Sequence, residues 1–122
     1  MSKADALRIP DYLEHIVEAI ERIHRYVDGL SETGFLGDDK TRDAVIRNYE
    51  VLGEAARNLE RYHAAFVAQH PQVPWELMVV MRNKVALGYF QVDYETVWKS
   101  IHADLPPLHH AVKALLDSWI AP

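Results

Sequence analysis

A polar cluster interrupts an apolar segment near the middle of this 122-residue chain. The run from Trp75 to Met81 is largely apolar and ends abruptly in Arg82, Asn83 and Lys84. Burying such a cluster without partners is costly, so it predicts a functional site or a surface that something covers. The three side chains offer a guanidinium, an amide and an ammonium. Together they suit a phosphate group, because an arginine can bind two phosphate oxygens at once.

Arg82 has a second interpretation, which the residue types favour equally. Glu54 lies beside Gly53, Ala55 and Ala56 in a segment of helical periodicity, and a carboxylate there needs a cationic partner. Arg82 could supply it inside the fold. Glycine in a helix costs about 1 kcal/mol relative to alanine, and small residues let another helix approach closely. Gly53 therefore predicts a helix crossing rather than a catalytic role.

The spacing after Arg82 limits which side chains can act together. Tyr89 follows Arg82 by seven residues, so a continuous helix would place both on nearly the same face. Leu87 follows Arg82 by five residues, which is about 140° around the helix axis. Positions 82 and 87 converge only if the helix ends near Gly88 or if a second copy of the chain supplies the other half of the site.

Other chemistries find little support in the sequence. The absence of cysteine excludes thiol nucleophiles, iron–sulfur clusters and thiolate zinc sites. The histidines lack the i, i+4 spacing that a helical metal site prefers, so we predict neither a metal nor a cofactor. The net charge of −5 is not that of a general nucleic-acid binder, so any contact with RNA would need a local basic cluster such as Arg82 and Lys84. The polar start, Met1–Asp5, and the lack of a long apolar window predict a cytoplasmic protein without a membrane segment.

The chain is expected to form one all-α domain over residues 1–122, a compact bundle of about five to six helices with a flexible tail over residues 1–9. Apolar residues recur with helical period, glycine is scarce and no hairpin signal is present. Residues 34–37 read as a loop around Phe35 and Leu36. Asp38 or Asp39, and Asp93, are candidate helix caps. The predicted helical segments are 10–30, 38–59, 61–69, 74–88, 94–102 and 108–120.

The stretch around Arg82 resembles the motif of HEPN domains, and most closely that of HepT-like proteins. That motif is Arg-x-x-x-x-His-x-Tyr, usually with Asn directly after the Arg, and Arg82, Asn83 and Tyr89 match it in register. The resemblance extends over most of the chain. It includes the segments Gly53-Glu54-Ala55-Ala56, Pro71–Trp75 and Asp104-Leu105-Pro106.

The resemblance implies a helical homodimer in which two motifs face each other in a cleft. HepT-like proteins are toxins of toxin–antitoxin modules and act as metal-independent ribonucleases, with tRNA among their targets. Their antitoxin, MntA, is a nucleotidyltransferase that transfers AMP to the motif tyrosine. Carried over, Arg82 would hold the scissile phosphate, with Lys84 as a further RNA contact, and Asn83 would orient the phosphate or the partner's arginine. Tyr89 would accept AMP.

Leu87 departs from this pattern, because it stands where the motif has histidine. Metal-free RNA cleavage needs a group that takes up and returns protons near neutral pH, which histidine does and leucine cannot. The chain as written is therefore expected to be inactive or nearly so, unless His24 or His63 substitutes. Leu87 is either an inactivating change or the mark of a natural non-catalytic member. In the second case the chain would be a binding partner that positions a nucleotidyltransferase.

Overall fold

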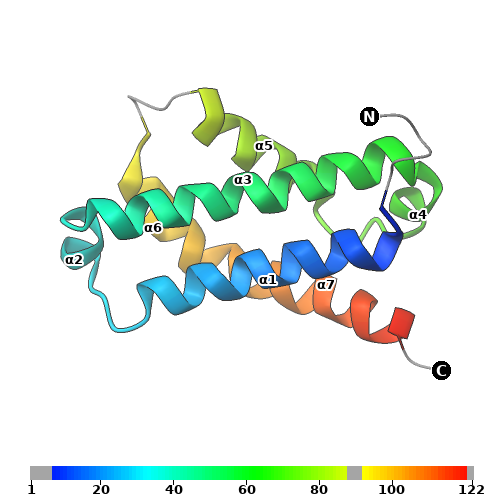
Figure 1. Ribbon diagram of the computed structural model, residues 1–122, viewed down its shortest axis with the longest axis horizontal. Coiled ribbons are helices and arrows are strands. Elements are labelled where there is room, and N and C mark those ends of the chain that lie inside the picture. Colours follow the sequence, from blue (N-terminus) through cyan, green and yellow to red (C-terminus); the bar gives the residue numbers. More distant parts are fainter. Residues whose placement is uncertain (1–6, 88–91, 121–122) are drawn as a thin grey trace.

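The computed structural model describes residues 7–87 and 92–120, except for the side chains of residues 86, 87 and 120. These residues form helices and no strand, which confirms the all-α prediction (Figure 1). The helices are α1 (Ile9–Val27), α2 (Glu32–Leu36), α3 (Asp39–Tyr62), α4 (Ala64–Gln69), α5 (Trp75–Leu87), α6 (Tyr94–Ala103) and α7 (Leu105–Ile120). None of these helices has the length and apolar character needed to cross a bilayer.

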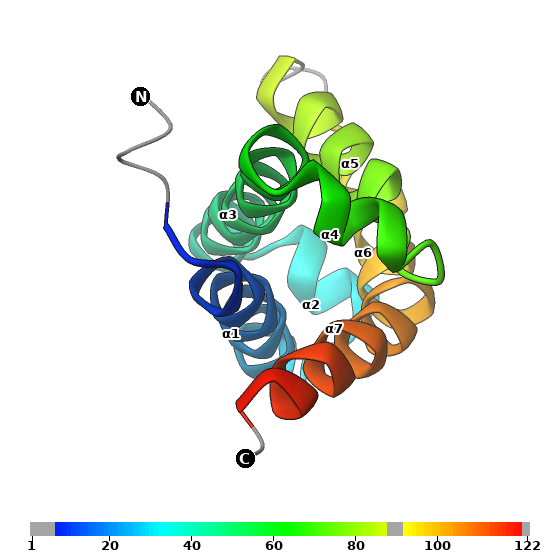
Figure 2. The ribbon, with the colours of Figure 1, turned by 90° about the vertical axis from the view of Figure 1, so that its right-hand side faces the viewer.

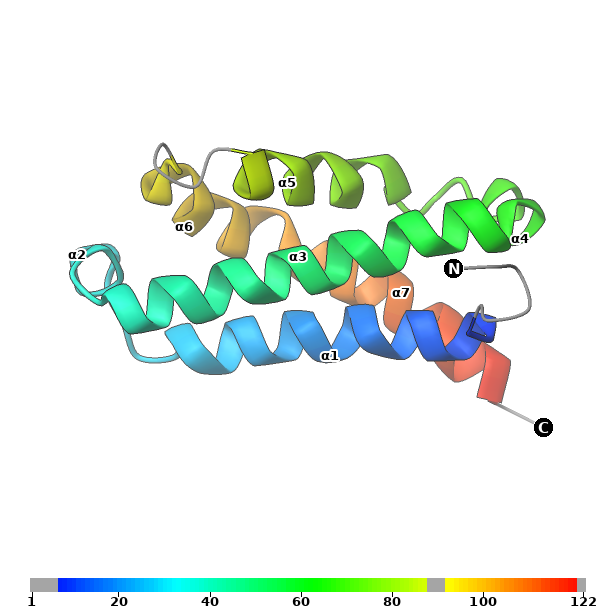
Figure 3. The same ribbon diagram turned by 45° about the horizontal axis from the view of Figure 1, so that its top comes forward.

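Four long helices enclose the core. α1 packs against α3 and α7, and α3 also packs against α5. Seen along the bundle, these four helices surround the interior (Figure 2), and α3 runs antiparallel to both of its neighbours α1 and α5 (Figure 3). The apolar stripe of α1 faces inward, as its helical period predicts. Side chains from several helices are fully buried there, among them Leu13, Ile16, Ile20, Leu52, Leu59, Met78 and Ile101.

The segment expected to be a loop around Phe35 is instead the short helix α2. Ser31 caps it, because its Oγ accepts a hydrogen bond from the Gly34 N–H at 3.0 Å. Phe35 is completely buried and contacts the rings of Tyr94 and Trp98 on α6. Burial of this one aromatic ring outweighs the poor helix propensity of glycine, which suggested a loop.

Three other helix starts show how local chemistry sets helix ends. Asp38 caps α3 and Asp93 caps α6, each accepting a backbone hydrogen bond from the residue three positions on, as predicted. α7 begins at Leu105, three residues before the expected start. Pro106 and Pro107 therefore lie in its first turn, where the missing N–H groups would have no partner within the helix.

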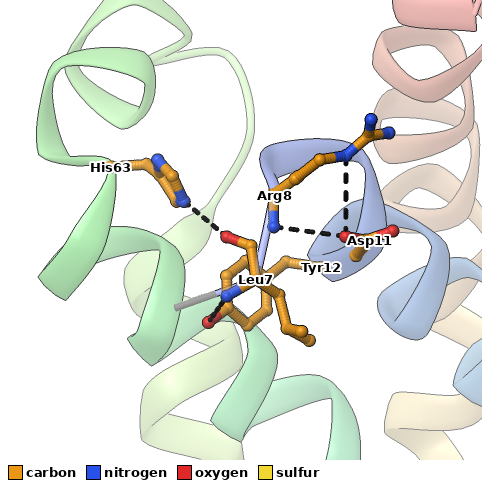
Figure 4. A network of polar contacts seen from close by, with 5 residues as sticks. All are labelled: Leu7, Arg8, Asp11, Tyr12 and His63. Atoms are coloured by element: carbon orange, nitrogen blue, oxygen red, sulfur yellow. Dashed lines mark hydrogen bonds and ion pairs between the residues drawn. The ribbon is translucent and has the colours of Figure 1, made fainter. Parts of the chain in front are cut away.

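The start of the described chain is tied to the end of α3 (Figure 4). The Leu7 N–H donates to the hydroxyl of Tyr12 at 3.1 Å, and His63 Nε2 donates to the Leu7 carbonyl at 2.9 Å. Asp11 accepts from the Arg8 N–H at 3.2 Å. α1 thus begins at Ile9, inside the segment 1–9 that was expected to be a tail, and residues 1–6 of that segment lie outside the described part.

Candidate functional site

Arg82 lies on the core-facing side of α5. Trp75, Met78 and Val85 of the same helix are buried, and Arg82 continues their three- and four-residue spacing. A charged side chain on such a stripe needs a route to the surface. The side chain of Arg82 finds one, since it remains 29% exposed.

Gly53 on α3 provides the room for that route. A Cβ atom at this position would lie 2.1 Å from Cβ of Arg82, 2.7 Å from its Cγ and 2.8 Å from the carbonyl oxygen of Met78. Only a residue without a side chain allows α5 to approach α3 this closely. The predicted helix crossing at Gly53 is therefore confirmed, and the residue that crosses there is Arg82.

Two polar groups contact the Arg82 guanidinium within the described part of the chain. Arg82 Nη1 donates to Asn83 Oδ1 at 3.1 Å, and Arg82 Nη2 lies 3.6 Å from Glu54 Oε2. The second distance is that of an ion pair and is too long for a hydrogen bond. Glu54 is 49% exposed, and ion pairs as accessible as this one contribute only about 0.2–1 kcal/mol. The predicted pairing of Arg82 with the Glu54 carboxylate is thus present in the structure. Because this ion pair is long and exposed, it leaves N–H donors of the guanidinium available to a ligand.

Lys84 lies away from this pair. It follows Arg82 by two residues, so the two positions are about 160° apart around the axis of α5. Lys84 lines a cavity of about 480 Å³ between α5 and α6, together with Leu77, Val80 and Met81. Within one copy of the chain, the structure therefore brings Arg82 and Asn83 together and places Lys84 on the side of α5 opposite Arg82.

The floor of this cavity is formed by Tyr49 of α3. Its hydroxyl donates to Oγ of Ser100 at 2.9 Å, and burial raises the pKa of the hydroxyl above its usual value. The phenol therefore stays protonated across the physiological pH range. It provides a neutral hydrogen-bonding group in a wall that also contains Lys84, Asp93 and Asp104.

The surface of α5 that borders this cavity is apolar as well. Leu77 and Val80 are 38% and 37% exposed, although both belong to large hydrophobic residue types. α5 is therefore apolar both toward the core and toward solvent. This second apolar face was not predicted, although the nearly unbroken apolar run from Trp75 to Met81 was a signal for it.

The two remaining motif positions lie at or beyond the end of α5. α5 is helical from Arg82 through Leu87, so positions 82 and 87 lie about 140° apart around the helix axis. Tyr89, and the helix stop expected at Gly88, lie outside the described residues.

The two histidines considered as substitutes for the missing motif histidine both contact backbone carbonyls elsewhere. His24 Nε2 is 3.4 Å from the carbonyl oxygen of Ile101 on α6. His63 is engaged with Leu7, and it lies ten residues beyond Gly53 along the chain, about 15 Å at 1.5 Å per helical residue. Among the described residues, no group of three acidic or histidine side chains could hold a metal ion.

The comparisons with known proteins agree with this arrangement. The family model described as "Ribonuclease HepT-like" matches residues 16–115, which include α5 and the whole of α3.

The chain belongs to the ribonuclease HepT-like family. A protein of Thermococcus cleftensis named "Probable ribonuclease HepT" is 43% identical over 98 residues, which cover 80% of this chain and 86% of that protein. A protein of Caldanaerobacter subterraneus, whose name is "Putative RNase", is 36% identical over 106 residues, covering 87% of this chain and 92% of its own length. A protein of Methanocaldococcus jannaschii with the same kind of name is 37% identical over 95 residues, which cover 78% of this chain and 76% of that protein. No solved structure matches the chain.

This HepT-like architecture makes a specific prediction at Gly53. In Gly53→Ala the new methyl group would overlap Arg82 and the Met78 carbonyl, which cannot move without shifting α5. Overpacking costs up to about 3 kcal/mol, and the better helix propensity of alanine returns about 1 kcal/mol. We expect the free energy of unfolding to fall by about 2 kcal/mol in urea denaturation.

Gly37→Ala is the matched control for this substitution. A Cβ at Gly37 would have its nearest neighbour at 3.5 Å, an ordinary contact. Its unfolding free energy should therefore change much less. Equal stability of Gly53→Ala and the wild type would contradict the close approach of α3 and α5.

Proposed function

We propose that this HepT-like chain is a ribonuclease toxin in which Arg82 binds the scissile phosphate of RNA. The observation that carries the proposal is the placement of a partly exposed guanidinium at the crossing of α3 and α5, where Gly53 fixes its stem. Fixed donors stabilise the charge that develops on a phosphate during cleavage better than mobile ones do. Asn83 holds the plane of the guanidinium through its hydrogen bond.

The proposed site is completed by a second copy of the chain. Within one helix, positions 82 and 87 diverge by about 140°, so one copy cannot direct both at the same group. The apolar outer face of α5, with Leu77 and Val80 exposed, supports pairing along this helix. Such a dimer would bring the Lys84 side chains of the two copies together, because Lys84 lies on the same side of α5 as Leu77 and Val80.

Leu87 impairs the catalytic step in this proposal. Cleavage without a metal requires removal of a proton from the ribose 2′-hydroxyl and delivery of a proton to the leaving oxygen. Such acid–base assistance is typically worth about 10²- to 10⁴-fold in rate, and leucine provides none. His24 and His63 both contact backbone carbonyls elsewhere, which gives no support to either as a replacement.

Regulation would act on the same region of the chain. In the proposal, a cytoplasmic MntA-like nucleotidyltransferase neutralises the toxin by transferring AMP to Tyr89. The bulk and negative charge of a tyrosyl AMP would exclude RNA, with tRNA as the proposed target, from a cleft that contains Arg82. Cleavage itself would need no cofactor.

Leu87 also favours a second candidate function, that of a non-catalytic partner which positions a nucleotidyltransferase. Both functions keep the dimer and the protein partner. They differ in whether a competent ribonuclease site returns when the missing imidazole is restored.

Restoring histidine at position 87 tests the proposed reaction. We expect Leu87→His to raise the rate of RNA cleavage by about 10²-fold or more, because it returns an acid–base group to the cleft. The measurement is cleavage of purified tRNA, followed on denaturing gels in the presence of a metal chelator. Leu87→Gln serves as the control, since it adds a polar side chain that cannot exchange protons near neutral pH. If the histidine variant dimerises but leaves tRNA intact, the scaffold function replaces the ribonuclease.

The dimer is tested on the outer face of α5. Leu77→Glu places a charge in the proposed interface and should raise the dimer dissociation constant at least about tenfold. Tyr26→Glu is the matched control, because Tyr26 is also 38% exposed but lies on α1. Sedimentation velocity over a concentration series measures both. A wild-type chain that stays monomeric at high micromolar concentration would exclude this dimer.

A further inference from the structure

The carboxylate of Glu54 lies beside Nη2 of Arg82, one of the donor groups that a bound phosphate could use. Its Oε2 lies 3.6 Å from Arg82 Nη2, while Nη1 is engaged by Asn83. A guanidinium binds a phosphate best through two parallel N–H donors. A phosphate seated in that way would bring a second negative charge next to Glu54.

We propose that Glu54 is a built-in competitor for the phosphate at Arg82, which RNA must displace in order to bind. This inference rests on the proposed function, in which Arg82 is the phosphate ligand. The carboxylate then keeps the site neutral in the free protein. It swings toward water when RNA arrives, and Asn83 continues to hold the guanidinium.

The contacts between α3 and α5 indicate that Glu54 is not needed to hold the two helices together. The crossing of α3 and α5 is set by the contact of Gly53 with the stem of Arg82 and by the fully buried side chains of Met78 and Ala56. The ion pair adds no hydrogen bond to that contact, and about half of the Glu54 side chain is exposed. Loss of the carboxylate should therefore leave the fold almost unchanged. It should nevertheless remove a negative charge from the phosphate position.

α3 also supplies a matched control for the loss of this charge. Glu50 lies one turn before Glu54 and forms an ion pair with Arg47, at 3.8 Å between Nη1 and Oε2. Glu50→Gln and Glu54→Gln thus remove the same charge from the same helix, and each breaks one arginine pair. Only the second variant frees Arg82.

The experiment measures binding of a fluorescein-labelled 12-nucleotide single-stranded RNA to the full chain by anisotropy at fixed salt. The chain as written, with Leu87, serves for all variants. We expect Glu54→Gln to bind this RNA about two- to fivefold more tightly than the wild type, the factor that corresponds to an exposed ion pair. Glu50→Gln should show a smaller change, and thermal denaturation should show both variants folded.

A double-variant cycle assigns any gain to Arg82. In the background of Arg82→Ala, Glu54→Gln should no longer improve binding, because the cation for which the carboxylate competes is gone. The inference is overturned if Glu54→Gln weakens binding, if Glu50→Gln gives an equal gain, or if the gain persists without Arg82. If Arg82→Ala alone leaves RNA binding unchanged, the proposed function itself fails. Weaker binding of Arg82→Ala combined with no gain in Glu54→Gln removes only the present inference.

Discussion

The contact between Gly53 and the stem of Arg82 is the constraint on which the rest of the site depends. Because α3 has no side chain at that point, α5 comes close enough for Cβ and Cγ of the arginine to lie against the α3 backbone. The aliphatic stem is thereby fixed by packing, and only the guanidinium reaches the surface. A side chain anchored in this way loses little further conformational freedom when it binds an anion. Packing in the bundle thus holds the arginine in position before a ligand binds.

The Arg82 guanidinium is both paired with a carboxylate and accessible to a ligand. The pairing with Glu54 is present, yet it is long and exposed, so it neutralises the arginine without sequestering it. In a HepT-like ribonuclease, a partly exposed arginine without such a partner would attract many anions. An adjacent carboxylate raises the threshold for binding, which only a ligand with several simultaneous contacts would overcome. The net charge of −5 acts in the same direction, since it disfavours nonspecific association with nucleic acid.

Residue chemistry predicted the all-α class, the caps at Asp38 and Asp93, and the helix crossing at Gly53, because each follows from local rules of periodicity, capping and size. The sequence could not show which helix crosses at Gly53, since that depends on how α5 folds back along α3. Helix α2 was missed because the burial of Phe35 against Tyr94 and Trp98 joins segments about 60 residues apart in the chain. The separation of Lys84 from Arg82 follows from helical geometry, because the two residues are two positions apart. The exposed apolar face of α5 depends on α6 lying beside it without covering it, which periodicity alone does not show.

The proposed function depends on one role, that of Arg82, held at Gly53, as the phosphate ligand of this HepT-like chain. Its most direct test is a titration of the ¹⁵N-labelled protein with a short RNA, followed through the Nε–Hε resonances of the arginine side chains. If Arg82 has this role, its resonance shifts and saturates, while that of Arg47, which pairs with Glu50 one turn before Glu54 on α3, changes little. An Arg82 resonance that stays in place while other arginine resonances shift would contradict it.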